Sequence, residues 1–400
     1  MKALSATGFA GLGAGLIAVA YGLARFAFGL FVPPIRDALG LSPDVVGMVG
    51  AMAFISFSLT SLVAAAVADR LGARGAAMLA SGFGVAGLGL ISQARDAVVL
   101  GAGVFACGIC TGLMMPAMSA GAQATVQPRL HGRVNAVMNA GTSAGVALSV
   151  PAVLLLADAW RAAYVSFAAL AALGLVAAWH LLPADSVRDA VGAAGKPGIT
   201  PAQRAALTRL AAFGFGMGLV SSAYWVFAPD LAVARGGMAA SDTGLLWLAV
   251  GVVGFGGGLA GDVVDRIGAA ATQGGALLML AAALALLAAA PDRMGLSLVS
   301  AGLFGLAYMT LTGVYLVTGI RLLPDRPSLG PVLPFLSIGV GQAVGSPLAG
   351  MAVGWAGYTG AFMGFAAFGV AVAAASPLFP GRSAVSGSRS RDQEFVDWTG

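Results

Sequence analysis

The sequence predicts an all-α membrane protein of twelve transmembrane helices, arranged as two pseudo-symmetric six-helix bundles. Three observations predict this class: few charged residues, a regular series of long apolar segments, and sequence matches between the two halves of the chain. Charged residues make up 9% of the 400 residues and hydrophobic residues 59%, whereas soluble domains carry about 25% charged residues. A soluble protein of this composition would expose large apolar patches and aggregate. A surface that faces lipid can be apolar without causing aggregation.

The long apolar segments fall into two sets of six. Each is close to the roughly 20 residues that a helix needs to cross the hydrocarbon core of a bilayer. The first set spans residues 8–33, 44–67, 75–93, 97–122, 133–157 and 160–182. The second set spans residues 206–229, 242–262, 270–290, 295–322, 330–353 and 358–379. The 60 glycines agree with this interpretation, because small residues let membrane helices pack closely.

A less apolar stretch between the two sets predicts the domain organisation. Residues 1–182 form the expected N-terminal six-helix bundle, and residues 206–380 form the C-terminal six-helix bundle. Residues 183–205, which contain charges and prolines, form a cytoplasmic linker. Residues 381–400 are rich in Ser, Gly and Arg, a composition typical of a disordered tail.

The distribution of Lys and Arg predicts the orientation in the membrane. If the N-terminus is cytoplasmic, fifteen Lys and Arg residues lie in cytoplasmic segments, five lie outside, and one lies within a span. Cytoplasmic loops of membrane proteins carry an excess of these residues. We therefore expect both termini, including the tail, in the cytoplasm.

Three sequence matches relate the two halves of the chain. Residues 68–74 read ADRLGAR, and residues 264–270, 196 positions later, read VDRIGAA. The other two matches are Gly141 and Gly145 with Gly341 and Gly345, and the aromatic stretch from Trp160 with the one from Tyr358. Because the matches keep the same order at similar offsets, they indicate two homologous halves. Transporters are commonly built from such repeats, with the substrate site between them.

The D-R-x-G sequence of the first match has a physical role at a helix end. Its carboxylate and guanidinium can pair with each other or with a neighbouring helix terminus, and its glycine permits a tight reversal into the next span. The alternative is a charged turn that only obeys the orientation rule. The motif recurs after the eighth segment, and this recurrence favours the role in charge pairing and chain reversal over a charged turn alone.

This loop resembles the signature G-x-x-x-D-R-x-G-R-R of the major facilitator superfamily, and the chain is similar to bacterial members over about residues 8–380. The departures are Ala65 and Ala73, where the signature has Gly and a basic residue. The resemblance implies a multi-pass protein of the bacterial inner (plasma) membrane. It also implies that Asp69 helps to hold the cytoplasmic side closed in the outward-facing state. The implied gating residues in the two loops are Asp69, Arg70, Gly72, Arg74, Asp265, Arg266 and Gly268.

A second, weaker resemblance concerns the fifth segment. Gly141, Gly145 and Pro151 partly resemble the antiporter signature of the superfamily, in which Pro directly follows the second Gly. Small residues at this spacing also serve close helix packing in general. Antiport therefore stays one of two interpretations of this segment.

Arg25 is the basic residue that lies well inside a predicted span. An arginine at the bilayer centre costs about 2.5–3.5 kcal/mol on insertion scales, and such residues usually face a water-filled cavity and serve a pathway. The planar guanidinium favours a carboxylate as its ligand. The alternative is that Arg25 extends toward the membrane surface or binds a backbone carbonyl.

Other polar and aromatic side chains share helical faces with this arginine or lie in corresponding segments. In the superfamily, the first, fourth, seventh and tenth helices line the substrate cavity. The candidate substrate-binding residues are Arg25, Tyr21, Phe28, Thr111, Met115, Ser221, Tyr224, Trp225, Tyr308, Thr312 and Tyr315. For each of them the alternative is an interhelical hydrogen bond or aromatic packing. Gln342 in the eleventh segment is interpreted as an interhelical hydrogen-bonding residue.

Titratable residues within the spans are scarce. Proton coupling usually uses such a residue, and Asp230 near the outer end of the seventh segment is the candidate for it. A membrane enzyme would need clustered nucleophiles, carboxylates or metal ligands at membrane depth. The two histidines lie near loops. We therefore expect no catalytic residue, metal or cofactor.

These features predict a secondary active transporter that moves a small organic solute, anionic in character, by alternating access. One alternative is a multidrug-type exporter of hydrophobic or cationic compounds, which the methionine- and aromatic-rich segments favour. An alternative from another class is a membrane receptor or sensor that does not transport. The expected partners are the small-molecule substrate, membrane lipid, and a coupling proton or counter-solute. We expect a monomer with no nucleic-acid partner.

Overall fold

The computed structural model describes residues 4–183, 198–323, 330 and 332–380. The described residues form helices and short connections, with no β-strand among them. The predicted tail, residues 381–400, and most of the predicted linker, residues 184–197, lie outside the described residues.

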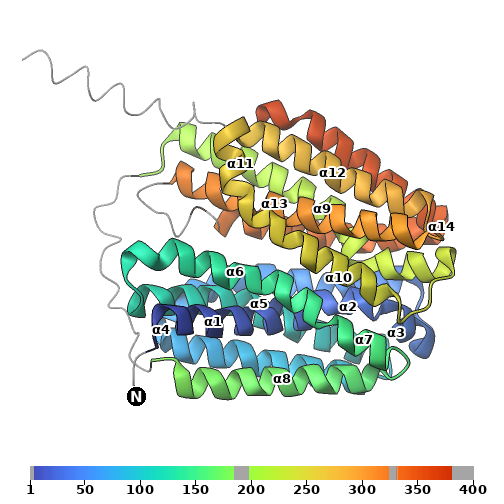
Figure 1. Cartoon of the computed structure of the whole chain (residues 1–400), viewed down its shortest axis with the longest axis horizontal. Helices are drawn as coiled ribbons and strands as arrows, with labels where there is room; N and C mark the ends of the chain where they lie inside the picture. Colours follow the sequence, from blue (N-terminus) through green and yellow to red (C-terminus); the bar gives the residue numbers. More distant parts are fainter. Residues whose placement is uncertain (1–3, 184–197, 324–329, 331, 381–400) are drawn as a thin grey trace, which may run out of the picture.

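The helices of residues 6–181 run nearly parallel or antiparallel to one another (Figure 1). They are α1 (Ala6–Ile17), the π-helix η1 (Ala18–Phe26), α2 (Ala27–Leu30), α3 (Val32–Leu39), α4 (Pro43–Gln93), α5 (Ala97–Thr125), the short η2 (Pro128–Leu130), α6 (His131–Leu148), α7 (Val150–Leu156) and α8 (Trp160–Leu181). In this part of the chain α4 packs against α5 and α8, and α1 packs against α6.

The helices from residue 201 onward lie mostly on the other side of the molecule (Figure 1). They are α9 (Pro201–Gly236), α10 (Thr243–Gly254), the 3-10 turn η3 (Phe255–Leu259), α11 (Ala260–Ile267), α12 (Ala269–Ala289), α13 (Met294–Leu322), α14 (Val332–Ala374) and the short η4 (Ser376–Leu378). Here α14 packs against α9 and α12, and α13 packs against α10 and α12.

Within the described part of the chain, ten helical segments are long and apolar enough to cross a membrane. Two of them are far longer than a span requires, since α4 has 51 residues and α14 has 43, while about 20 suffice. Both contain one non-helical glycine, Gly72 (φ 70°, ψ 172°) in α4 and Gly357 (φ 70°, ψ 173°) in α14. A positive φ is accessible to glycine without steric cost, so each long segment is kinked at its glycine.

Positive-φ glycines also mark two ends of the molecule. Gly40 ends α3 and Gly237 ends α9, both in the left-handed conformation. Gly72 and Gly268 are the glycines of the two D-R-x-G sequences, and Gly268 has φ 89°. We call these two ends the Gly40 end and the Gly72 end. The matching backbone conformations at both D-R-x-G sequences agree with the repeat that the sequence indicates.

Helices from before and after the linker meet closely at the Gly40 end. There α4 packs against α14. A Cβ added at Gly47 would collide with the carbonyl oxygen of Ser346, and one added at Gly350 would collide with that of Pro43. Small residues allow such close backbone approach in membrane proteins. We call this contact the α4–α14 seam.

Candidate functional site

The π-helix η1 carries the arginine that the sequence singles out. In η1 the backbone N–H of Ala27 bonds the carbonyl of Gly22, five residues earlier. Such π-helical turns occur mostly as short insertions in α-helices, often at functional sites. The hydroxyl of Thr111 in α5 donates to the carbonyl of Ala20, at 3.1 Å. This bond ties η1, which carries Arg25, to the neighbouring helix.

The Arg25 side chain is buried, with 7% of its surface exposed. Its Nη2 donates to Oε1 of Gln342 in α14, at 2.8 Å. The amide nitrogen of Gln342 in turn donates to the Tyr308 hydroxyl at 3.2 Å and lies 3.4 Å from the Ser221 hydroxyl. This polar network therefore joins η1 with α14, α13 and α9. We call Arg25, Gln342, Tyr308 and Ser221 the Arg25 network.

Aromatic rings surround the guanidinium. The Arg25 Cζ lies 4.2 Å from the ring centroid of Phe57 and 4.9 Å from that of Phe54. The rings of Phe26 and Tyr21 are 5.2 and 5.9 Å away. A cation within about 6 Å of a ring centroid is attracted by the ring quadrupole. These contacts stabilise the buried charge without neutralising it.

No carboxylate pairs with Arg25 in the described structure. The two ion pairs found there join Arg36 to Asp230 and Arg321 to Asp265. The Nε of Arg25 is buried and has no hydrogen-bond partner. Since a buried charge is normally paired, Arg25 carries both an uncompensated charge and an unused donor.

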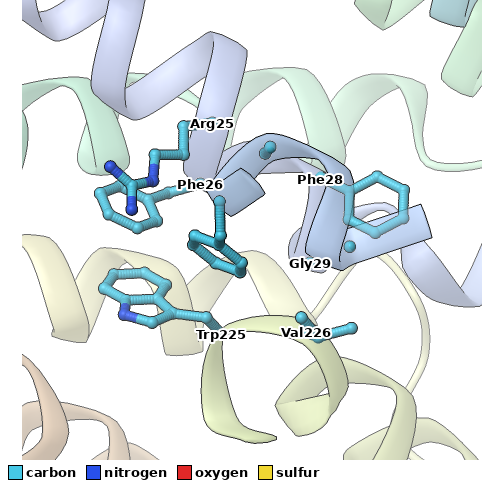
Figure 2. Close-up of a pocket in the computed structure, with 9 residues that line it drawn as sticks. Arg25, Phe26, Phe28, Gly29, Trp225 and Val226 are labelled. Atoms are coloured by element: carbon cyan, nitrogen blue, oxygen red, sulfur yellow. The ribbon is translucent and has the colours of Figure 1, made fainter. Parts of the chain in front are cut away.

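A small cavity adjoins Arg25, at the contact between η1, α2, α4 and α9 (Figure 2). Its volume is about 10 Å³, which corresponds to about one water molecule. The residues that line it are Arg25, Phe26, Phe28, Gly29, Gly50, Ala53, Phe54, Trp225 and Val226. Figure 2 shows Phe26 between Arg25 and Trp225, and the Phe26 and Trp225 rings stack with centroids 4.0 Å apart. Arg25 is thus the one charged residue in an aromatic lining.

The structure brings together about half of the candidate substrate residues. Tyr21, Ser221, Trp225 and Tyr308 lie around Arg25, and Phe28 lines the cavity. Gln342, Phe54 and Phe57 join them, although the candidate set omits them. The sequence did contain a signal for Gln342, because it is the one glutamine in the apolar run of α14. Phe54 and Phe57 gave no signal, because phenylalanine is common in membrane helices.

The remaining candidates contact other groups. The Tyr224 hydroxyl bonds Ser300 at 3.1 Å, and the Tyr315 hydroxyl accepts a bond from Gln273 at 2.9 Å. Thr312 donates to the carbonyl of Met309 in its own helix. Met115 is half-buried against the apolar cluster of α1 and α5. Thr111 reaches the backbone of η1 rather than the Arg25 side chain.

The candidate gating residues lie near the Gly72 end. Asp69 and Arg70 are exposed, and so is Arg266. Arg74 donates to the carbonyl of Leu182, at 2.6 Å, which ties this loop to the end of α8. Asp265 pairs with Arg321 of α13, at 2.8 Å, with both side chains partly exposed.

Asp230 belongs to a second buried polar group, at the Gly40 end. Its Oδ2 accepts a bond from Nη1 of Arg36 at 2.7 Å and a short bond from the Tyr358 hydroxyl. Arg36 also bonds the Tyr358 hydroxyl. Burial lowers the pKa of the Arg36 guanidinium, but Asp230 and Tyr358 outweigh this and raise the pKa above its ordinary value. We call these three residues the Asp230 cluster; it joins α3, α9 and α14.

Among the described residues, no three His, Cys, Asp or Glu side chains lie together as a metal site requires. The Arg25 network combines one uncompensated cation with hydroxyl and amide groups and aromatic walls.

Comparisons with known proteins bear on the fold. The sequence profile of the Major Facilitator Superfamily matches residues 14–328. The comparison with curated proteins gave no match. Among solved structures, a POT family transporter in complex with 5-aminolevulinic acid is similar, with a TM-score of 0.76, 13% identity, and coverage of 93% of this chain and 96% of that one.

Two further solved structures are similar over nearly the whole chain. One is a mutant of the nucleoside transporter NupG, with a TM-score of 0.73, 14% identity, and coverage of 93% of this chain and 99% of that one. The other is a bacterial homolog of the human lysosomal transporter Spinster, with a TM-score of 0.73, 16% identity, and coverage of 92% and 95%. At these identities the similarity concerns the fold.

Proposed function

Because the chain belongs to the Major Facilitator Superfamily, we propose that it is a secondary active transporter that moves a small anionic organic solute by alternating access. The multi-pass membrane fold is common to this chain and its structural neighbours. The solute class is inferred from one observation, the uncompensated guanidinium of Arg25 in the middle of the molecule.

A buried charge without a partner is costly to retain. Removing an ion from water into a protein interior costs several kcal/mol even after relaxation, and the aromatic contacts of Arg25 return only part of this. A carboxylate would supply the missing charge and could use two donors of the planar guanidinium at once. A substrate anion therefore explains why Arg25 is buried here.

The architecture that accompanies this proposal has twelve spans in two six-helix bundles. Gly72 and Gly357 each divide a long segment into two spans, which adds two to the ten apolar segments. The bundles comprise residues 1–182 and 206–380, with the linker and both termini in the cytoplasm of a bacterium. The Gly40 end then faces outward, and the Gly72 end, with its D-R-x-G loops, faces the cytoplasm.

Several contacts close the Gly40 end, which this proposal places outside. The α4–α14 seam and the Asp230 cluster both lie there. The Trp247 indole N–H of α10 also donates to the carbonyl of Phe26, at 3.2 Å. These contacts support an inward-facing or occluded state, in which a solute would reach Arg25 from the cytoplasmic side.

The neighbours do not identify the solute. One of them was solved with 5-aminolevulinic acid, which is a small carboxylic acid, while another is a nucleoside transporter. A shared fold hosts many substrates, so the substrate class must come from the chemistry of the site. The aromatic lining also favours a second candidate, an exporter of hydrophobic compounds, because four rings surround the guanidinium.

A binding experiment separates the two candidates. Purified protein is heated with small carboxylates, hydrophobic cations or neutral aromatic compounds, because a ligand that binds only the folded state raises the apparent Tm. We expect carboxylates to stabilise wild type but not Arg25→Gln. If hydrophobic cations stabilise both proteins and carboxylates stabilise neither, the anion proposal is wrong and the exporter replaces it. Size-exclusion profiles and circular dichroism confirm that the variant is folded.

A further inference from the structure

The described structure leaves no room for a solute next to Arg25. The adjoining cavity holds about 10 Å³, whereas pockets for small molecules have about 300 Å³ or more. The guanidinium faces aromatic rings on several sides, and these accept at most weak N–H···π bonds. A carboxylate can therefore reach the arginine only if a side chain that now contacts it moves away.

The polar side chain that would have to move is Gln342. We propose that, without substrate, Gln342 occupies the position on Arg25 that the substrate carboxylate takes, and that the substrate binds by displacing it. The inference rests on the anion site proposed above and adds a residue to it. The Oε1 of Gln342 accepts from Nη2 of Arg25 at 2.8 Å, as one oxygen of a carboxylate would.

The exchange is favourable because of charge. The amide of Gln342 is neutral, so its bond leaves the Arg25 charge uncompensated and the Nε donor unused. A carboxylate adds an opposite charge to its hydrogen bonds with the guanidinium, and it can engage two donors at once. The substrate thus replaces one neutral acceptor with a charged and bidentate one.

Displacement does not leave Gln342 without partners. Its amide nitrogen lies 3.2 Å from the Tyr308 hydroxyl and 3.4 Å from the Ser221 hydroxyl, on α13 and α9. These contacts stay within the part of the chain after the linker. The bond that is lost is the one from η1 to α14, which spans 317 residues of sequence. Substrate binding therefore removes a direct polar link between the proposed bundles.

The lining also narrows the class of solute. Arg25 is the one charged residue among those that line the cavity, and Phe26, Phe28, Phe54 and Trp225 supply most of the remaining surface. One cation in an aromatic lining fits a monocarboxylate with an apolar or aromatic body. Benzoate is the probe that combines these properties, and benzyl alcohol is its uncharged counterpart.

The test uses two substitutions of Gln342 in the full chain. Gln342→Glu places a carboxylate on Arg25, so we expect a higher Tm without ligand and benzoate binding at least tenfold weaker than in wild type. Gln342→Met keeps the side-chain length and removes the acceptor, so benzoate should bind with equal or lower apparent Kd. Ser346→Ala, whose hydroxyl bonds only the Gln342 carbonyl, is the control on the same helix and should behave as wild type.

Each outcome separates this inference from the proposed function. If Gln342→Met binds benzoate tenfold or more weakly than wild type does, Gln342 is a substrate ligand and the displacement inference is wrong. This measurement decides the question even if Gln342→Glu does not fold. A wild-type protein that neither benzoate nor any other carboxylate stabilises would overturn the anion site itself, and the inference with it.

Discussion

Two arginines of the N-terminal region, Arg25 and Arg36, both reach across to α14, yet their partners differ. Arg36 bonds a carboxylate, Asp230, and the hydroxyl of Tyr358. Arg25 bonds a neutral amide, Gln342. Arg36 keeps 26% of its side chain exposed, while Arg25 is buried at 7%. The protein thus neutralises the more exposed charge and leaves the more deeply buried one uncompensated.

This difference separates two kinds of polar group in one interface. The Asp230 cluster is complete in itself, and its bonds join α3, α9 and α14 at the Gly40 end. The Arg25 network lacks an anion, so it can gain free energy from a ligand. We therefore expect substitutions in the Asp230 cluster to change stability, and substitutions in the Arg25 network to change anion binding.

The largest expected effect is the loss of anion binding in Arg25→Gln. Charge-assisted hydrogen bonds contribute about 1.5–3 kcal/mol each, so two of them correspond to a loss of roughly 100-fold or more in affinity for a carboxylate. Thermal stability without ligand should not fall, because the substitution removes an uncompensated buried charge. Flux into liposomes and the Tm of the ligand-free protein check both parts.

Arg25→Lys is the matched control for this prediction. It keeps the charge and loses the planar fork, so binding should fall less than in Arg25→Gln. Equal loss in both variants would show that geometry rather than charge decides recognition. A large drop in Tm for Arg25→Gln would indicate that the arginine serves the fold.

The next effect is on stability and concerns Asp230→Asn. The substitution leaves Arg36 without its carboxylate, and because Arg36 is partly exposed we expect a loss of about 1–3 kcal/mol in the free energy of unfolding. Chemical or thermal denaturation measures it. The exchange variant Arg36→Asp with Asp230→Arg should recover part of the loss. Carboxylate affinity should stay near wild type, in contrast to Arg25→Gln.

The same variant tests Asp230 as the site of a coupling proton. Transport driven by a proton gradient should be lost in Asp230→Asn, while exchange of labelled for unlabelled solute should continue, because exchange needs no net proton movement. Unchanged gradient-driven uptake would assign Asp230 to the closure of the Gly40 end alone.

The smallest effects are expected for two tyrosine hydroxyls, one in each group. Tyr358→Phe removes bonds to both Asp230 and Arg36, and it should cost about 1–2 kcal/mol of stability. Tyr308→Phe removes one acceptor for the Gln342 amide and should cost about 0.5–1 kcal/mol. Denaturation curves of the two variants side by side measure the difference. A greater loss for Tyr308→Phe would reverse the proposed contrast between the groups.

The sequence predicts the all-helical membrane fold and the loop motifs, because these depend on local pattern. The D-R-x-G repeat predicted a tight turn, and Gly72 and Gly268 both have positive φ. The π-helix η1 was not predicted, since its hydrogen-bond shift leaves no mark in a run of apolar residues. The first predicted segment, 8–33, is divided in the structure into α1, η1, α2 and the start of α3.

For the candidate site, the sequence identified individual residues better than their partners. Arg25 and Asp230 stand out as charges in apolar runs. Asp230 lies 194 residues from Arg36 and 128 residues from Tyr358 in the sequence. No local sequence pattern could therefore reveal that these residues are partners. The resemblance to the superfamily placed Tyr224 and Tyr315 on cavity-lining helices, but their hydroxyls bond Ser300 and Gln273. Periodicity gives the side of a helix and not the neighbour on that side.

The α4–α14 seam has a consequence for how fast the proposed bundles can separate. At Gly47 and Gly350 the two helices touch through their backbones, with no side chain in between. Interlocked side chains would have to change rotamer before such a surface could part, and ordering them again would cost conformational entropy of about 0.5–2 kcal/mol each. A contact of bare backbone avoids that reordering. In the proposed alternating-access mechanism, the seam would therefore open and close as two rigid surfaces that recover the same fit in each cycle.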